Sequence, residues 1–132
     1  MVRVLLAITH GLLRAAVLEY LGADKVLCEE AGNAEALWEQ LCRYPWDVLI
    51  LDFCLPGHTK LQTLRTVHGR YPNLPILVIS FAVDIPAKYW QVAGASGWVS
   101  KAKLSTELIE AVKRISEGGK YFSSEGAEGT IR

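Results

Sequence analysis

The chain has 132 residues with 14 basic and 14 acidic side chains, and 51% of its residues are apolar. This length suits a single domain, and the composition is that of a globular protein and not of a disordered chain. The zero net charge lacks the basic excess typical of nucleic-acid-binding domains. We therefore expect neither DNA nor a membrane to be a direct partner.

Three widely spaced cysteines, Cys28, Cys42 and Cys54, form no Cys-x-x-Cys pair. The pattern contains no zinc motif and favours reduced thiols in a cytoplasmic protein. The first apolar run, Val2–Ile8, is too short to cross a bilayer and lacks the layout of a signal peptide. It is typical of a buried strand.

Apolar, strand-like runs alternate with segments of helical spacing along the whole chain. The predicted strands are Val2–Ile8, Val26–Ala31, Asp47–Asp52, Pro75–Ser80 and Trp98–Ser100. The predicted helices begin near Leu12, Asn33, Thr59, Ile85 and Leu104, and Gly118-Gly119 closes the last of them. This order predicts an α/β fold, a doubly wound five-stranded parallel sheet, with a frayed tail after Tyr121.

Polar side chains follow three successive predicted strands, namely Asp52, Ser80 and Lys101. The carboxyl ends of parallel strands form the edge where such sheets bind ligands. Asp52 is a candidate nucleophile that would form an acyl phosphate, Ser80 a hydrogen-bond donor to it, and Lys101 its counter-charge. A single aspartate at a strand end is more often a structural cap, but the ordered trio favours a phosphoryl site.

The chain resembles receiver domains of bacterial two-component response regulators. The residues that carry the resemblance are Leu51–Gly57, Val78–Ser80, Gly94–Gly97 and Trp98–Lys101, and Glu117–Phe122 is similar to the end of receivers that precede a LuxR-type helix-turn-helix. The resemblance covers residues 2–122, so we expect a receiver domain over 1–122 and a linker stub or disordered tail over 123–132. It implies a flavodoxin-like (βα)5 fold with strand order 2-1-3-4-5.

The resemblance also implies roles for single residues. Asp52 matches the phospho-acceptor, Ser80 and Trp98 match the switch pair, and Lys101 matches the lysine that pairs with phosphate charge. The backbone carbonyl of Cys54 falls where the family provides a ligand to Mg²⁺. Trp98 is larger than the usual switch aromatic, so we expect its inward rotation to be hindered.

The chain departs from the family after the first strand, where two adjacent acidic residues are replaced by Ile8 and Thr9. Mg²⁺ prefers carboxylate ligands, so we expect it to bind weakly or not at all, and we expect no other cofactor. Lys101 is then expected to pair one-to-one with Asp52. His58 or Lys60 would be the nearest substitute for the metal charge, although surface solvation is the simpler interpretation.

We therefore predict an atypical receiver in two-component signal transduction and transcription regulation, not an enzyme, with impaired phosphorylation and a protein-interaction or dimerisation role. The alternative is an ordinary receiver that takes a phosphoryl group from a histidine kinase on Asp52. Enzyme alternatives are weaker. An aspartate-based phosphatase needs an acid at the position where Cys54 stands, and a flavin-binding protein needs a phosphate-binding loop for which Thr9–Gly11 is too short.

The expected partners are a histidine kinase or another signalling protein and a second copy of the chain. We expect DNA to be contacted only indirectly, through a C-terminal helix-turn-helix domain that is absent from this sequence. Tyr89 and Trp90 would form an interface if both were exposed on the fourth helix.

Overall fold

The computed structural model describes residues 2–22, 26–43, 45–54, 61–81 and 85–123. Its central feature is a parallel sheet with strand order β2-β1-β3-β4-β5-β6. The strands are β1 (Val2–Ala7), β2 (Val26–Glu30), β3 (Val48–Asp52), β4 (Ile76–Ser80), β5 (Gly97–Ser100) and β6 (Tyr121–Phe122). The helices are α1 (Gly11–Leu21), α2 (Ala34–Leu41), α3 (Gln62–Arg70), α4 (Ala87–Ala93) and α5 (Leu104–Ser116), with a 3₁₀ turn, η1, over Lys101–Lys103.

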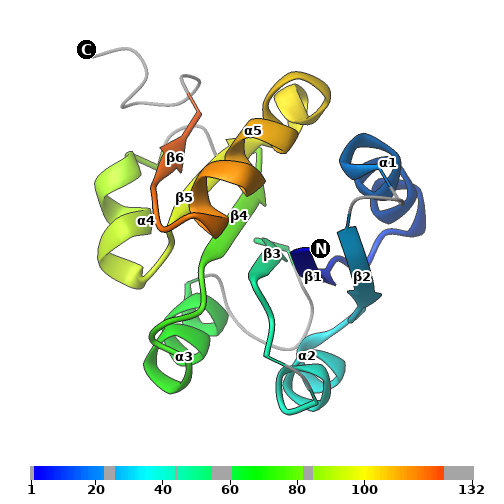
Figure 1. Ribbon diagram of the computed structural model, residues 1–132. Helices are drawn as coiled ribbons and strands as arrows, with labels where there is room; N and C mark the ends of the chain where they lie inside the picture. The colour runs from blue at the N-terminus through cyan, green and yellow to red at the C-terminus, as the bar shows by residue number, and fades with distance from the viewer. Residues whose placement is uncertain (1, 23–25, 44, 55–60, 82–84, 124–132) are drawn as a thin grey trace.

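Helices cover both faces of this sheet (Figure 1), with α1 and α5 on one side and α2, α3 and α4 on the other. Each face buries its own apolar cluster. One cluster joins Leu37, Leu64 and Trp90 to the sheet, and the other joins Val17 and Leu108 to it. The middle strands β3 and β4 are buried along their whole length, as expected for strands covered on both faces. The predicted doubly wound α/β class is therefore confirmed.

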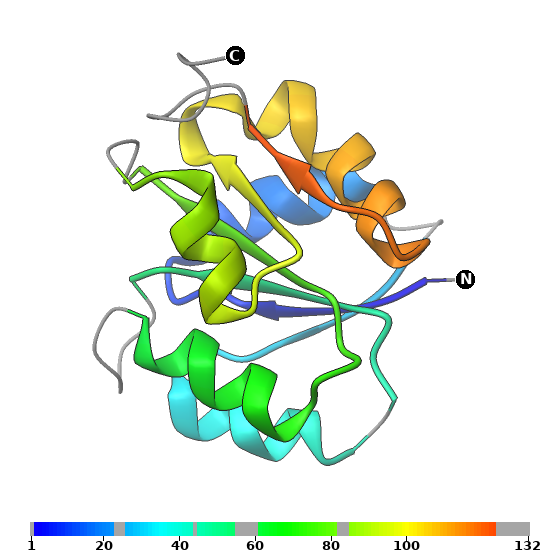
Figure 2. The same cartoon turned by 90° about the vertical axis from the view of Figure 1, so that its left-hand side faces the viewer.

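The prediction of five strands is wrong, because a sixth strand, β6, pairs in parallel with the outer edge of β5 (Figure 2). Two residues are too few to show an alternating apolar pattern, so no strand is predicted there from the residues alone. The pairing depends on a tertiary contact. A Cβ atom on Gly97 would overlap the carbonyl oxygen of Tyr121, so only glycine permits this approach.

Local signals placed several elements correctly. Asn33 caps α2, as predicted, since its side-chain oxygen accepts a hydrogen bond of 2.8 Å from the amide of Ala36. The prediction that β2 lies at a sheet edge is also confirmed. Residues 59–60, predicted to begin the third helix, lie outside the described residues, and α3 is described from Gln62.

The condition set for an aromatic interface on the fourth helix is not met. Trp90 is fully buried, so it does not form an exposed pair with Tyr89, which is 53% exposed. Leu12 and Ile109 occur at helical spacing with buried apolar residues but are themselves 90% and 61% exposed. These residues lie at the margins of the apolar faces, where spacing alone does not decide which side chain the sheet covers. No helix in the described part of the chain is long and apolar enough to cross a membrane.

We predict that Gly94→Ala lowers the free energy of unfolding. Gly94 closes α4 with a left-handed φ of 115°, and an added Cβ would overlap the ring of His68. The backbone strain alone costs about 1–3 kcal/mol. Gly69→Ala is the matched control, because Gly69 lies in α3 with no atom within 4 Å of the added Cβ. It should raise the free energy of unfolding by about 0.5–1 kcal/mol in urea denaturation. Equal effects of the two changes would contradict this account.

The three cysteines are free thiols, and we predict that Cys28 is the slowest to be alkylated. Burial, followed by the charges of Glu30 and Glu29, raises the pKa of Cys28 from 9.0 to about 11. Since the thiolate is the reactive form, its rate near pH 8.5 should be roughly 100-fold below that of a thiol without this shift. Iodoacetamide labelling followed by peptide mass spectrometry compares it with the exposed Cys42. Faster labelling of Cys28 than of Cys42 would refute the prediction.

Candidate functional site

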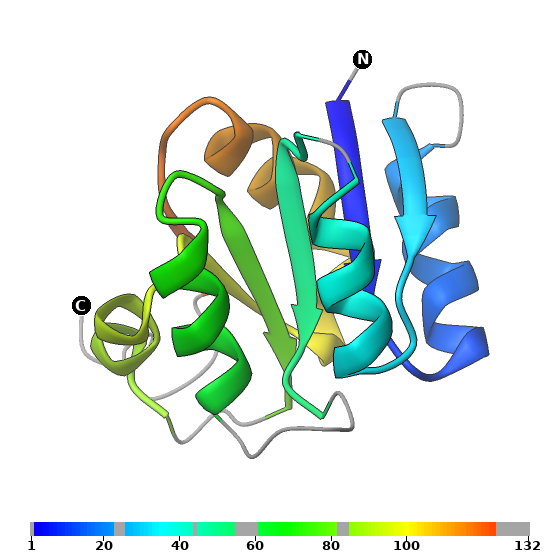
Figure 3. The same ribbon diagram turned by 90° about the horizontal axis from the view of Figure 1, so that it is seen from below.

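The predicted site residues meet at the carboxyl edge of the sheet. Asp52 ends β3, Ser80 ends β4, and Lys101 follows β5 at the start of η1. The arrowheads of β3 and β4 point to this common edge (Figure 3). The register aligns Asp52 with Ile79 and Ser80 with Ser100, so the three predicted side chains come from adjacent strands. Both Asp52 and Ser80 are buried, with 1% and 3% of their surface exposed.

A buried ion pair joins the two charged members of the trio. The Nζ atom of Lys101 lies 2.8 Å from Oδ1 of Asp52, and the two side chains are only 9% and 1% exposed. The amide of Cys54 donates a second hydrogen bond of 3.0 Å to the same oxygen. The other oxygen, Oδ2, is buried and has no hydrogen-bond partner among the described residues. Lys101 thus neutralises Asp52 one-to-one, as the sequence led us to expect.

The loop after β1 presents no carboxylate to this edge. Ile8 is fully buried in the apolar cluster shared with α1 and α5. Thr9 is exposed, and its hydroxyl donates a hydrogen bond of 2.7 Å to the carbonyl of Gly32. Within the described ranges, no group of three or more His, Cys, Asp or Glu side chains is placed to hold a metal ion.

Sequence reasoning missed Arg14, which organises the same loop. Its guanidinium donates hydrogen bonds of 2.9 and 3.1 Å to the carbonyls of Ile8 and Thr9. It also forms a 2.7 Å ion pair with Glu30 at the end of β2. The backbone of Ile8 and Thr9 is therefore held by an arginine. An arginine at the start of α1 is a signal too common to have been singled out from sequence alone.

The ring of Trp98, the predicted switch aromatic, is buried with 2% of its surface exposed. It is accommodated by stacking on Trp90, with ring centroids 6.5 Å apart and planes 8° apart. That its size hinders rotation stays a prediction. Sequence reasoning also missed Phe81, which is 67% exposed and lies 5.7 Å from the Nζ atom of Lys101. The Nζ atom of Lys101 thus lies over the face of the Phe81 ring, with the distance measured to the ring centroid.

The remaining predicted participants lie partly outside the described residues. His58 and Lys60, named as substitutes for a metal charge, belong to residues 55–60 and are not described. Cys54 is described and exposed, and it contacts Asp52 through its amide.

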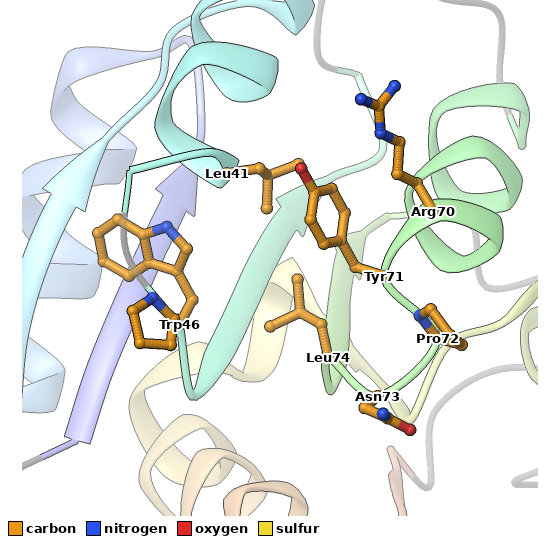
Figure 4. Close-up of a pocket in the computed structure, with 8 residues that line it drawn as sticks. Leu41, Trp46, Arg70, Tyr71, Pro72, Asn73 and Leu74 are labelled. Atoms are coloured by element: carbon orange, nitrogen blue, oxygen red, sulfur yellow. The ribbon is translucent and has the colours of Figure 1, made fainter.

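A concave region lies at the opposite edge of the sheet (Figure 4). Trp46, Leu41, Tyr71 and Leu74 line a cleft of about 380 Å³, just before β3 and β4 begin. The indole N–H of Trp46 donates a hydrogen bond of 2.8 Å to the carbonyl of Gln40, which fixes one wall. Because the cleft is at the amino ends of the strands, it is separate from the Asp52 edge.

Fold and site together define the class of this protein: a doubly wound α/β domain with a buried aspartate–lysine pair at the carboxyl edge of its sheet. Comparison with known proteins identifies the family. The family described as "Response regulator receiver domain" matches residues 4–113. The chain therefore belongs to the response regulator receiver domain family.

Relatives at about 30% identity are response regulators and transcriptional activators. The DNA-binding transcriptional activator DevR/DosR of Mycobacterium tuberculosis is 33% identical over 131 residues, covering 96% of this chain and 60% of the relative. Response regulator UvrY of Escherichia coli is 30% identical over 134 residues, covering 97% and 60%. The chain thus spans about three fifths of the length of these relatives.

Solved structures share the fold at lower identity. The RcsB response regulator of Salmonella typhimurium superposes with a TM-score of 0.82 at 23% identity, covering 90% of this chain and 61% of that one. A LuxR-family two-component response regulator from Aurantimonas sp. SI85-9A1 gives a TM-score of 0.81 at 22% identity, with 98% of both chains covered.

We predict that the Asp52–Lys101 pair is strongly coupled in stability. Lys101→Met leaves a buried carboxylate without its counter-charge, which costs about 3–5 kcal/mol of unfolding free energy. The double change Asp52→Asn with Lys101→Met removes both charges, so it should be less destabilising than Lys101→Met alone. Urea denaturation of the four proteins in this cycle measures the coupling.

The exposed pair of Glu110 and Arg114 is the control for that cycle. Both side chains are more than half exposed, so Glu110→Gln should change stability little. Additive effects of the Asp52 and Lys101 changes would show that the two charges are independent and contradict the prediction.

Proposed function

We infer that this receiver domain acts in two-component signalling with impaired Mg²⁺-dependent phosphorylation, and that it works mainly through contacts with other proteins. Asp52 is the proposed phospho-acceptor, Ser80 and Trp98 the proposed switch pair, and Lys101 the residue that balances charge. The single observation that carries the inference is the buried one-to-one ion pair of Asp52 and Lys101, beside a loop in which Ile8 and Thr9 replace carboxylates.

The residues present do not fit a receiver-type Mg²⁺ site. Mg²⁺ requires near-octahedral oxygen ligands with carboxylates among them. Oδ1 of Asp52 already contacts Lys101 and the Cys54 amide, Ile8 offers only aliphatic carbon, and the Thr9 hydroxyl donates to Gly32. One buried carboxylate with a lysine against it has no remaining charge to hold a divalent cation. We therefore derive no phosphoryl-transfer step through a metal.

The charge state of the site supports a signalling role without a metal. A phosphoryl group on Asp52 would add negative charge that the metal and a lysine normally balance together. Here the lysine already balances the resting carboxylate, so the site is neutral before any modification. Neutrality and burial hold the three strand ends in one arrangement, which suits a domain that presents a constant surface to partners.

The proposed partners are a histidine kinase or another signalling protein and a second copy of the chain. Tyr89 and Val92 expose apolar surface on one side of α4, with 53% and 82% of their surface accessible. The relative DevR/DosR is described as a DNA-binding transcriptional activator and is longer than this chain. We propose that any contact of this domain with DNA is indirect. We propose that the domain is cytoplasmic, because its proposed partners are proteins of two-component signalling.

One observation favours the alternative of an ordinary phospho-accepting receiver. Oδ2 of Asp52 has no hydrogen-bond partner among the described residues, so this oxygen is not engaged by the ion pair. A carboxylate oxygen that is not held by a donor is available to attack phosphorus. The two proposals differ in whether the attack proceeds at a useful rate without the acidic pair.

Incubation with acetyl phosphate, with and without Mg²⁺, followed by intact-mass spectrometry distinguishes them. We expect the wild-type protein to gain at least tenfold less phosphate than an ordinary receiver, because the metal stabilises charge in the transition state. Ile8→Asp with Thr9→Asp should restore Mg²⁺-dependent labelling. Thr9→Asp alone is the control, because it adds charge at an exposed position without a buried carboxylate.

Asp52→Asn must abolish any labelling in every background, which assigns the modified residue. Full, Mg²⁺-dependent and Asp52-dependent labelling of the wild-type protein would overturn the proposal and establish the ordinary receiver.

A further inference from the structure

The cleft at the amino ends of β3 and β4 has the size and the lining of a small-molecule site. Its volume of about 380 Å³ falls within the range of about 300–1,000 Å³ typical of such sites. Leu41 and Trp46, which are only 4% and 8% exposed, line it from the apolar core. Figure 4 shows the ring of Tyr71 directed toward Leu41 and the indole of Trp46 at the other end of the cleft. A flat apolar group therefore has aromatic and aliphatic side chains to pack against.

Hydrogen bonds within the chain fix both sides of this cleft. On one side, the indole N–H of Trp46 donates to the carbonyl of Gln40 at 2.8 Å. On the other side, the amide of Tyr71 donates to the carbonyl of Val67 at 2.8 Å, and the amide of Leu74 donates to the carbonyl of Tyr71 at 3.1 Å. Because the walls are already held in place, a ligand does not have to order them, which lowers the entropic cost of binding.

Donors gather at one end of the cleft. Arg70 is the one charged side chain among the described residues that line it, and it is exposed at the end of α3. The hydroxyl of the next residue, Tyr71, lies 3.7 Å from Sγ of Cys42. The hydrogen-bonding contact with Cys42, followed by burial, raises the pKa of Tyr71 above 10.0, so its hydroxyl is protonated at neutral pH. A guanidinium and a phenol hydroxyl, with no carboxylate among the described lining residues, suit an anionic group.

The carboxyl ends of α2 and α3 also lie at this edge, and each helix end carries about half a negative charge, which disfavours an anion. At the end of α2, the carbonyl of Gln40 is already engaged by two donors, the indole of Trp46 and the amide of Arg43. At the end of α3, the full positive charge of Arg70 exceeds the partial charge of the helix. The α3 side of the cleft is therefore net positive.

We propose that this cleft binds a small aromatic carboxylate, with its ring against Trp46 and Tyr71 and its carboxylate paired with Arg70. The ring leaves water for an apolar surface, and a guanidinium pairs with a carboxylate through two parallel hydrogen bonds. The site lies at the edge of the sheet opposite Asp52 and does not depend on the proposed function. It would give the domain a chemical input that is separate from the phosphoryl edge.

Titration of the full chain with cinnamate, followed by ¹H–¹⁵N NMR, tests the site. At the affinity per atom that is usual for small ligands, cinnamate should bind with a Kd of roughly 1–5 mM. The chain has four tryptophans, so their indole N–H signals report on four places. The Trp46 signal and the amides of Tyr71 and Leu74 should shift saturably. The indole signals of Trp90 and Trp98, which are fully buried away from solvent, should shift far less.

Two uncoupled tests separate the carboxylate from the ring. Arg70→Gln should weaken cinnamate binding by at least fivefold, because it removes the charge that pairs with the carboxylate. Arg65→Gln is the matched control, since Arg65 is exposed on the same helix and is not among the described residues that line the cleft. It should change the Kd by less than twofold. Neutral cinnamamide has the same ring, so it should bind at least fivefold more weakly than cinnamate and be insensitive to Arg70→Gln.

Tyr71→Leu tests the ring contact, because it removes the aromatic face and the hydroxyl while keeping an apolar side chain. It should weaken cinnamate binding by at least threefold. The amides of β3 and β4 must keep their wild-type signals in each variant, which separates loss of the site from loss of the fold. If Tyr71→Leu disturbs those signals, the exposed Arg70→Gln decides the outcome.

Absence of a saturable shift of the Trp46 signal at about 10 mM cinnamate would overturn the proposal, since the cleft would then not be a site for this class of ligand. Equal Kd values for the wild-type protein and Arg70→Gln would overturn it as well, because the carboxylate would have no partner there. Shifts of the same size with acetate would show that charge alone is bound and would also contradict it. None of these results depends on acetyl phosphate labelling, so failure of this site is distinct from failure of the proposed function.

Discussion

The ion pair between Asp52 and Lys101 connects the ends of β3 and β5 across the end of β4, where Ser80 lies. Both charged side chains are almost entirely removed from water, and a buried charge is tolerated only with a close partner. One contact of 2.8 Å therefore joins the end of β3 directly to the start of the η1 turn. In a receiver with an acidic pair, the same lysine would face several carboxylates, and a metal ion would take part in balancing them.

The loop after β1 is held in place by apolar packing and by contacts of one arginine. Ile8 extends the apolar cluster beneath the loop, and Arg14 holds the carbonyls of Ile8 and Thr9 while pairing with Glu30. An arginine that supplies donors to backbone carbonyls fixes a loop from within, whereas a metal fixes it through its ligands. The loop is thus held by contacts within the chain.

Two glycines determine how the outer part of the sheet is assembled. Gly94 provides the left-handed residue that ends α4 beside His68, and Gly97 provides the space for the carbonyl of Tyr121. Trp90 and Trp98 lie between these two points, so their packing depends on the close approach of α4 and β6 to β5. The tryptophans fill this region at the cost of two indole N–H groups without acceptors among the described residues. Such a region is well packed but not fully satisfied in its hydrogen bonds.

The sequence by itself determined the alternation of strands and helices, the Asn33 cap and the meeting of Asp52, Ser80 and Lys101 at one edge. These features follow from local periodicity and from the geometry of parallel sheets, which brings all carboxyl ends together. The absence of two carboxylates at Ile8 and Thr9 was likewise readable from the residues alone.

Only the tertiary structure decided the sixth strand, the inward position of Trp98 and the role of Arg14. Each depends on partners distant in sequence: β6 on the space at Gly97, Trp98 on the face of Trp90, and Arg14 on Glu30. A spacing pattern reports which side chains share a face, but not which faces meet or how closely two backbones approach. For that reason the phosphoryl edge was predictable, whereas the contacts that connect it to the rest of the domain were not.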